Sequence, residues 1–112
     1  MCGIAGVATL GDGSAPATMA RLANTMATTL SHRGPDDAGV WANQGGEVAL
    51  AHRRLSVIDL SPLGHNPMLW RQGDLCITFN GEIYNFAELR CELESAGYRF
   101  RSRSDHDVGR YR

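Results

Sequence analysis

Lysine is absent from the 112 residues, and all eleven Lys or Arg positions are arginines. The chain therefore offers no lysine that could form a Schiff base or act as the cation of a phosphate-binding loop. The formal net charge is only -1, so the composition predicts neither a nucleic-acid-binding surface nor a polyacidic tail. No apolar run reaches about eighteen residues, and the start lacks a secretory pattern, so no membrane partner is predicted.

Cysteine is also scarce, with Cys2, Cys76 and Cys91 as the three examples and no CxxC spacing. This odd set argues against a disulfide framework or a zinc ribbon, and it favours a reducing cytoplasm as the location. The four histidines share no metal-ligand spacing, so no metal is assigned. A cysteine/histidine metal-binding module is kept as a weaker alternative, which stoichiometric zinc in the purified protein would support.

The residues that are present suit one small domain or part of a larger one, since 43% of them are hydrophobic. Apolar periodicity and turn residues predict the element order β-α-β-β-β-α-β, which indicates an α+β layered domain. The expected elements are a strand over 2–10, a helix within 15–34 that has Pro16 near its start and Gly34 past its end, strands over 38–43 and 47–60, a loop over 61–74, a strand over 75–79, a helix over 85–97 and a strand over 98–102.

Each expected helix has a predicted buried face and predicted ends. In the second helix, Leu89 and Leu93 form the apolar stripe, and Asn85 is expected to cap the N-terminus while Glu88 reaches back as in a capping box. Gly97 is expected to end that helix. In the first helix the apolar stripe is predicted from residues at spacings of three and four, namely Met19, Leu22, Met26 and Leu30.

Cys2 directly follows the initiator methionine, which is commonly removed when the next side chain is small. Cys2 would then carry a thiol and a free α-amino group on the same carbon. The amine has an unperturbed pKa of roughly 7.7–8.0 and the thiol one of about 8.5, so near neutral pH the amine can accept the thiol proton. Cys2 is therefore a candidate nucleophile, and the alternative is a small buried hydrophobic residue.

Asn80 and Gly81 follow an expected strand and have two interpretations. They are typical of a hairpin tip. Alternatively, the Asn80 side-chain amide and the Gly81 backbone N–H form an oxyanion hole, whose donors are often worth about 10²–10³ in the rate of acyl transfer.

Two further charged groups are candidate substrate contacts. Arg53 and Arg54 are adjacent in a strand-like run, so they are expected to point to opposite faces. The inward one needs an anion, which is either a substrate carboxylate or an internal Asp. Asp105 and Asp107 either hold a substrate ammonium or belong to a charged surface loop.

Five ordered stretches together resemble a known family: "MCGIAGV", "SHRGPDDAGVW", "ALAHRRLSVIDLSPLGHNPM", "ITFNGEIYNFAELR" and "SDHDV". They are similar to the glutaminase domain of class II glutamine amidotransferases, which are N-terminal-nucleophile hydrolases. Within that class, "HRGPD" and "RLSVIDL" resemble the asparagine synthetase (glutamine-hydrolysing) branch. The resemblance implies that glutamine is the substrate and that Cys2 attacks its side-chain amide, giving a γ-glutamyl thioester and ammonia.

The same resemblance implies a role for five other residues. Arg54 would hold the α-carboxylate of glutamine, and Asn80 with Gly81 would form the oxyanion hole. Glu82 and Asp105 would hold the α-ammonium group. One cation, two anions and a donor pair would thus meet the one carboxylate, one ammonium and one amide of glutamine.

The resemblance covers residues 2–108, which are assigned as the N-terminal portion of the glutaminase domain, and leaves 109–112 as a divergent tail. It implies the first part of a four-layer αββα sandwich, which is incomplete in these residues. The chain departs from the family pattern at three positions. Asn66 stands where glutamine is usual, and His106 and Asp107 stand where a small residue or cysteine and then glutamate are usual.

The resemblance also implies a synthetase domain or subunit as a partner, where ATP and magnesium activate aspartate or a related acid for amidation. That domain is absent from the sequence, so no cofactor is expected in the chain itself. A homodimer of the full-length enzyme is one assembly that the resemblance allows. The alternative is a truncated, non-catalytic remnant, in which a glutamine-analogue alkylator would not label Cys2.

Overall fold

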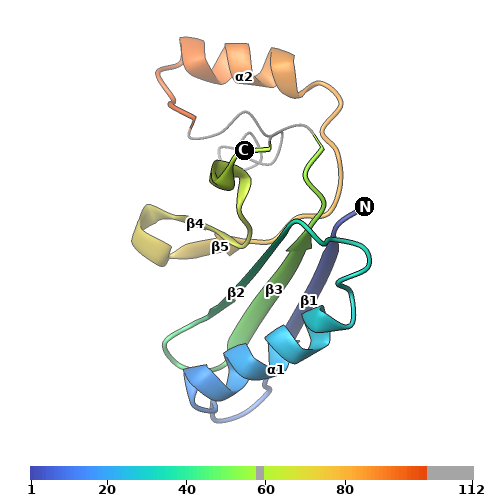
Figure 1. The fold of residues 1–112 in the computed structure, drawn as a ribbon. Coiled ribbons are helices and arrows are strands. Elements are labelled where there is room, and N and C mark those ends of the chain that lie inside the picture. Colours follow the sequence, from blue (N-terminus) through green and yellow to red (C-terminus); the bar gives the residue numbers. More distant parts are fainter. Residues whose placement is uncertain (58–59, 101–112) are drawn as a thin grey trace. The chain divides into compact units, whose positions relative to one another are not determined.

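The computed structural model describes residues 1–57 and 60–100, and Figure 1 follows the chain from β1 to α2. The chain divides into two units. The first comprises Met1–Leu55 and His65–Asn80, and the second comprises Ser56–Gly64 and Gly81–Arg112. The described ranges hold two antiparallel sheets and two α-helices, which confirms the α+β class.

A three-stranded antiparallel sheet in the order β1-β3-β2 forms the base of the first unit. Its register pairs Gly3 with Arg53 on one side of β3 and Asp37 with Arg54 on the other. The end of β3 therefore lies beside the beginning of both neighbouring strands. The strands are β1 (Gly3–Ala8), β2 (Asp37–Ala42) and β3 (Val48–Arg54).

The strand that the sequence predicts over 47–60 ends at Arg54 instead, and residues 58–59 of that range lie outside the described residues. Neither neighbour extends past this point, because the paired residues of β1 begin at Gly3 and those of β2 begin at Asp37. Without a partner on either side, the chain beyond Arg54 has no ladder to join. The predicted turn between the second and third strands is confirmed, since the side chain of Asn43 accepts backbone N–H groups from Glu47 and Val48.

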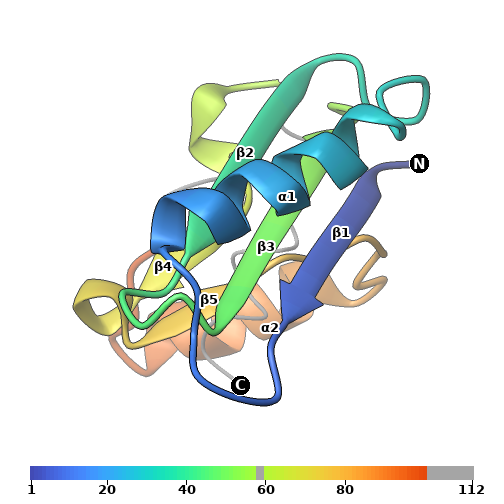
Figure 2. The same cartoon turned by 90° about the horizontal axis from the view of Figure 1, so that it is seen from below.

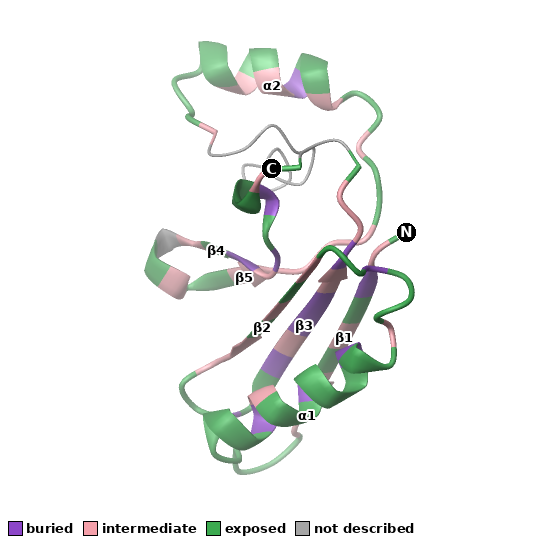
Figure 3. Cartoon of the chain, in the orientation of Figure 1, coloured by how far each residue is buried: buried purple, intermediate pink, exposed green. Residues whose placement is uncertain are grey.

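Helix α1 (Pro16–Thr28) covers one face of this sheet (Figure 2). Its buried residues are Met19, Ala23 and Ala27, and they pack on the buried Ala49 and Ala51 of β3. Small side chains on both elements let the helix axis approach the sheet closely. Figure 3 shows the result, with the buried residues concentrated along β3 and the side of α1 that faces it.

The predicted apolar stripe of α1 is wrong at two of its four positions. Leu22 is 47% exposed and Met26 is 41% exposed, whereas Met19 is buried. The face that packs is the row of residues four apart, where alanines match the small side chains of the sheet. Leu30 contacts the sheet beyond the helix, since a Cβ on Gly3 would lie 2.8 Å from the Leu30 side chain.

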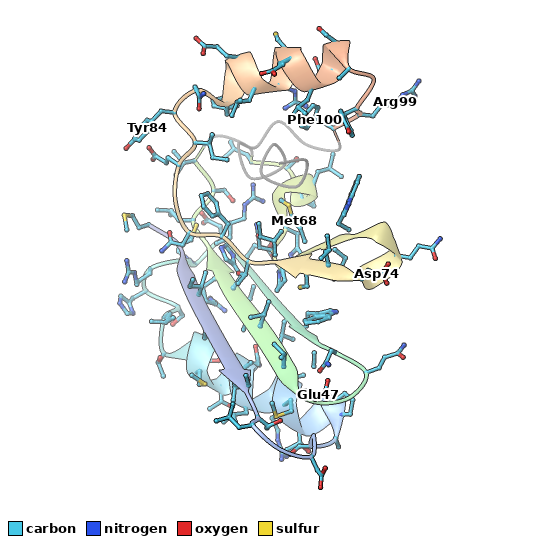
Figure 4. The ribbon with its side chains drawn as sticks, turned by 180° about the vertical axis from the view of Figure 1, so that it is seen from behind. Glu47, Met68, Asp74, Tyr84, Arg99 and Phe100 are labelled. Carbon is cyan, nitrogen blue, oxygen red and sulfur yellow. The ribbon has the colours of Figure 1, made fainter. Side chains whose placement is uncertain are left out.

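A hairpin of β4 (Met68–Trp70) and β5 (Leu75–Ile77) completes the first unit. The sequence predicts a loop over 61–74, so β4 corrects that prediction, and the expected buried strand over 75–79 is shorter and begins with an exposed Leu75. The turn Arg71–Gly73 supplies the reversal, with Gln72 and Gly73 both at positive φ. Met68 is the buried side chain of the hairpin, and Asp74 marks its turn in Figure 4.

The second unit contains the short 3₁₀ turn Pro62–Gly64 and helix α2 (Phe86–Ser95). Leu89 is buried, as predicted. The predicted capping box is wrong, because the Asn85 side chain makes no capping hydrogen bond. Instead, a preceding turn, in which the Phe86 N–H donates to the Ile83 carbonyl, leads into the helix.

The end of α2 follows the prediction at Gly97, which has a φ of 92°. The Tyr98 N–H donates to the Leu93 carbonyl, so glycine reverses the chain as in a Schellman motif. Residues 98–100 do not form the strand expected over 98–102, and 101–102 lie outside the described residues. Phe100 instead packs its ring under the Arg90 guanidinium, 4.5 Å away.

Candidate active site

Cys2 lies where β1 begins and β3 ends. Extending the β1–β3 register by one residue from Gly3 and Arg53 places Cys2 opposite Arg54. The Leu55 N–H donates to Cys2 Sγ at 3.3 Å, and the thiol lies 3.6 Å from the Leu55 carbonyl oxygen, which can accept its hydrogen. The antiparallel pairing therefore holds the half-buried sulfur against the backbone that follows Arg54.

Met1 precedes this sulfur and is 76% exposed. The peptide bond that processing would cleave therefore lies at the surface of the first unit. After cleavage, the new α-amino group would sit on the same Cα as the thiol.

The two adjacent arginines have different surroundings, as strand alternation predicts. Arg54 is only 6% exposed, and Arg53 is half-buried. The Nε–H of Arg53 donates to the Gly34 carbonyl at 3.0 Å, so this arginine anchors the segment after α1. Arg54 is thus the more buried cation of the pair, at the end of β3 beside Cys2.

His52 is a buried residue near these groups that the sequence patterns did not identify. It is 1% exposed and precedes Arg54 by two residues, so both lie on the same face of β3. Its Nε2 lies 3.1 Å from the carbonyl oxygen of Phe79, the residue before Asn80. Strand alternation from Arg54 was the signal that could have identified it, since "AHRR" places His52 on the same face of β3 as Arg54, opposite the face that packs on α1.

Asn80 is half-buried and is the last residue of the first unit. It does not form a hairpin tip with Gly81, because the hairpin of this unit turns at Arg71–Gly73. The hairpin interpretation of "NG" is therefore wrong. The residue before Asn80, Phe79, is instead connected to β3 by its hydrogen bond with His52.

The six residues predicted for the site fall into three groups. Cys2, Arg54 and Asn80 belong to the first unit, whereas Gly81 and Glu82 are exposed residues of the second unit, at the start of its segment Gly81–Arg112. Asp105 lies outside the described residues, as does its neighbour Asp107, which was considered beside it.

Asp37 and His65 form a hydrogen-bonded pair on the first unit. Asp37 lies opposite Arg54 in the register, and His65 Nδ1 lies 2.6 Å from its Oδ2. The segment after His65 lies directly on the sheet, because a Cβ on Gly39 would stand 1.9 Å from the carbonyl oxygen of Asn66. Only glycine at position 39 permits that approach. Asn66, where the sequence departs from the family pattern, is buried.

The three thiols differ in environment. Burial raises the pKa of the Cys76 thiol from 9.0 to about 11, so this thiol stays protonated at neutral pH. Cys91 is exposed on α2, and Cys2 is half-buried. Within residues 1–57 and 60–100, no group of three His, Cys, Asp or Glu side chains could hold a metal ion, and no helix is long and apolar enough to cross a membrane.

Comparison with known proteins finds similarity to a single family along most of the chain. Residues 1–109 match the family described as the glutamine amidotransferase domain. The chain is 40% identical over 108 residues to asparagine synthetase (glutamine-hydrolyzing) 1 of Bacillus subtilis (strain 168), a match that covers 96% of this chain and 17% of that protein. The protein of the same name from Arabidopsis thaliana gives the same identity and the same coverage.

A third relative has a different name. Amidase chry2 of Gibberella zeae is 37% identical over 84 residues, covering 75% of this chain and 12% of that protein. The chain therefore spans less than a fifth of the length of each of these three relatives.

Proposed function

Because the chain belongs to the glutamine amidotransferase domain family, we propose that it is the glutamine-hydrolysing part of an asparagine synthetase-like enzyme. The observation that carries this proposal is the position of Cys2. The Cys2 sulfur, which would be the first side chain once Met1 is removed, lies beside a buried arginine at the end of β3.

The first half of the reaction consumes the amide. The α-amine of Cys2 accepts the thiol proton, directly or through one water, and Sγ attacks the side-chain carbonyl carbon of glutamine. The resulting oxyanion is stabilised by the Asn80 side-chain amide and the Gly81 N–H. As the C–N bond breaks, the α-ammonium returns its proton to the leaving nitrogen, which leaves as ammonia and a γ-glutamyl thioester remains.

The second half regenerates the enzyme. Water attacks the thioester carbonyl and transfers a proton to the α-amine, and the C–S bond then breaks. The products are glutamate and the free thiol, so the net reaction converts glutamine and water into glutamate and ammonia.

Binding of the substrate is assigned to charged residues. The planar guanidinium of Arg54 matches a carboxylate through two parallel hydrogen bonds, and its burial would strengthen them. Glu82 and Asp105 would pair with the α-ammonium group of glutamine.

The larger assembly extends this proposal. Residues 2–108 would form the first part of a four-layer αββα sandwich with 109–112 as its tail, and ammonia would pass to a synthetase domain or subunit. There ATP and magnesium would activate aspartate or a related acid. We assign neither group to the chain described here.

A labelling experiment tests the proposed site. A chloroketone analogue of glutamine should alkylate Cys2 of the processed protein, and excess glutamine should protect it. Iodoacetamide at about pH 8 should also modify the exposed Cys91. Cys76 should react slowly with either reagent, because a pKa of about 11 leaves about one thiol in a thousand ionised at that pH.

Peptide mapping by mass spectrometry gives the readout. Labelling of Cys2 by the analogue without protection by glutamine would contradict a formed glutamine site. Equal labelling of Cys91 and Cys2 by the analogue would contradict it as well, since Cys91 lies on α2 and has no place in the reaction.

A further inference from the structure

His52 is the largest fully buried titratable side chain in the described residues, and the proposed reaction does not use it. It lies in the central strand β3, where Ile4 of β1 and Gly39 of β2 are its register partners. Because β3 pairs with a strand on each side, ladder hydrogen bonds hold the backbone around His52 from both sides. A donor on such a side chain is held in place by the sheet itself.

The hydrogen bond of His52 has a defined direction. A carbonyl oxygen can only accept, so Nε2 carries the hydrogen that is donated to Phe79 at 3.1 Å. The bond joins two segments that are 27 residues apart in the chain. Since β5 ends at Ile77, Phe79 lies beyond the last paired residue of that strand.

The accepting oxygen belongs to the peptide unit that leads into Asn80. That unit is planar, so the Phe79 carbonyl, the Asn80 N–H and the Asn80 Cα move together. When His52 holds the Phe79 carbonyl oxygen, it restrains the orientation of this peptide plane. The plane in turn sets the position of the Asn80 Cα, from which the side chain projects. Loss of the donor would leave a part-buried carbonyl without this partner and let the plane rotate.

We propose that His52 is a positioning residue that orients Asn80 by holding the Phe79 carbonyl. The inference rests on the proposed function, in which Asn80 stabilises the oxyanion. Because His52 and Arg54 share one face of β3, a single strand sets both the carboxylate clamp and the oxyanion donor. The rigid strand β3 would thus fix the spacing between the group that binds the substrate carboxylate and the group that stabilises the reacting amide.

This role differs from that of a histidine which only fills the core. Oxyanion stabilisation operates in the transition state, whereas Arg54 binds the ground state as well. Misplacing Asn80 should therefore lower kcat and leave KM for glutamine nearly unchanged. A general loss of packing would change both constants, or the fraction of folded protein.

Three substitutions separate the two roles. His52→Gln keeps an amide donor at about the reach of Nε2, and His52→Asn keeps an amide whose donor is too short. His52→Leu removes the donor altogether. We expect kcat to fall by about 10- to 100-fold in His52→Asn and His52→Leu, with KM unchanged, and His52→Gln to restore most of the rate.

Nuclear magnetic resonance provides a readout that does not need activity. The ring ¹⁵N shifts of His52 should show hydrogen at Nε2. The Phe79 carbonyl and Asn80 amide resonances should move in His52→Asn and His52→Leu, and return in His52→Gln. Wild-type kcat in His52→Leu, a KM effect alone, or no recovery in a folded His52→Gln variant would overturn the inference.

Failure of the proposed function is distinguishable from failure of this inference. If the processed wild-type protein hydrolyses glutamine no faster than its Cys2→Ala variant, the proposed function is rejected. The resonances of Phe79 and Asn80 would then still decide whether His52 orients this peptide unit, and unchanged resonances in all three variants would reject it.

Discussion

Replacing Cys2 with alanine is expected to reduce glutamine hydrolysis to the uncatalysed background, a loss of about 10⁴-fold or more. The effect is large because the sulfur forms the bond that carries the γ-glutamyl group. Glutamate release from glutamine by the processed protein is the measurement. Glutamine should still bind to the variant, since the substitution leaves Arg54 in place.

Cys91→Ala is the matched control, because it also removes one thiol but does so on the exposed surface of α2. Its activity should equal that of the wild-type protein. Retained hydrolysis in Cys2→Ala would contradict the assignment of the nucleophile, and so would a comparable loss in Cys91→Ala.

Replacing Arg54 with alanine should lower kcat/KM for glutamine chiefly by raising KM. Removing a buried, charged hydrogen-bonding partner typically costs about 2 to 5 kcal/mol, which corresponds to a factor of about 30 to several thousand. Arg54→Lys keeps the charge without the planar fork, so its kcat/KM should be intermediate. The thermal midpoint of each variant shows whether the first unit remains folded.

The neighbouring arginine offers a control that differs by one position in the same strand. Arg53→Ala removes a hydrogen bond to the Gly34 carbonyl and should lower stability without raising KM. Equal increases in KM for the two alanine variants would show that neither arginine recognises the α-carboxylate.

Strand alternation was the most reliable signal in the sequence. It correctly predicted different surroundings for Arg53 and Arg54, which are half-buried and buried, because a residue between two hydrogen-bonded neighbours has little freedom to turn. Which of the two is the buried one did not follow from alternation. Turn chemistry was equally informative at Gly97, where only a residue that tolerates positive φ ends α2.

The predictions that failed depend on partners far along the chain. Whether Leu22 or Ala23 of α1 faces the sheet is decided by the small side chains of β3, which helical periodicity does not reveal. The short strand Met68–Trp70 exists because Leu75–Ile77 pairs with it. The hydrogen bond from His52 to Phe79 joins residues that are 27 positions apart, so no local sequence pattern predicts it.

The central claim is that the α-amine and the thiol of one terminal residue act together. It is tested by inserting a protease recognition segment between Met1 and Cys2, so that cleavage leaves Cys2 as the first residue. Glutaminase activity is measured before and after cleavage, with intact mass confirming each form.

We expect background activity before cleavage and full activity afterwards, with unchanged circular dichroism. Full activity in the uncleaved, mass-verified protein would contradict it, because Cys2 would then have no free amine to act as the base.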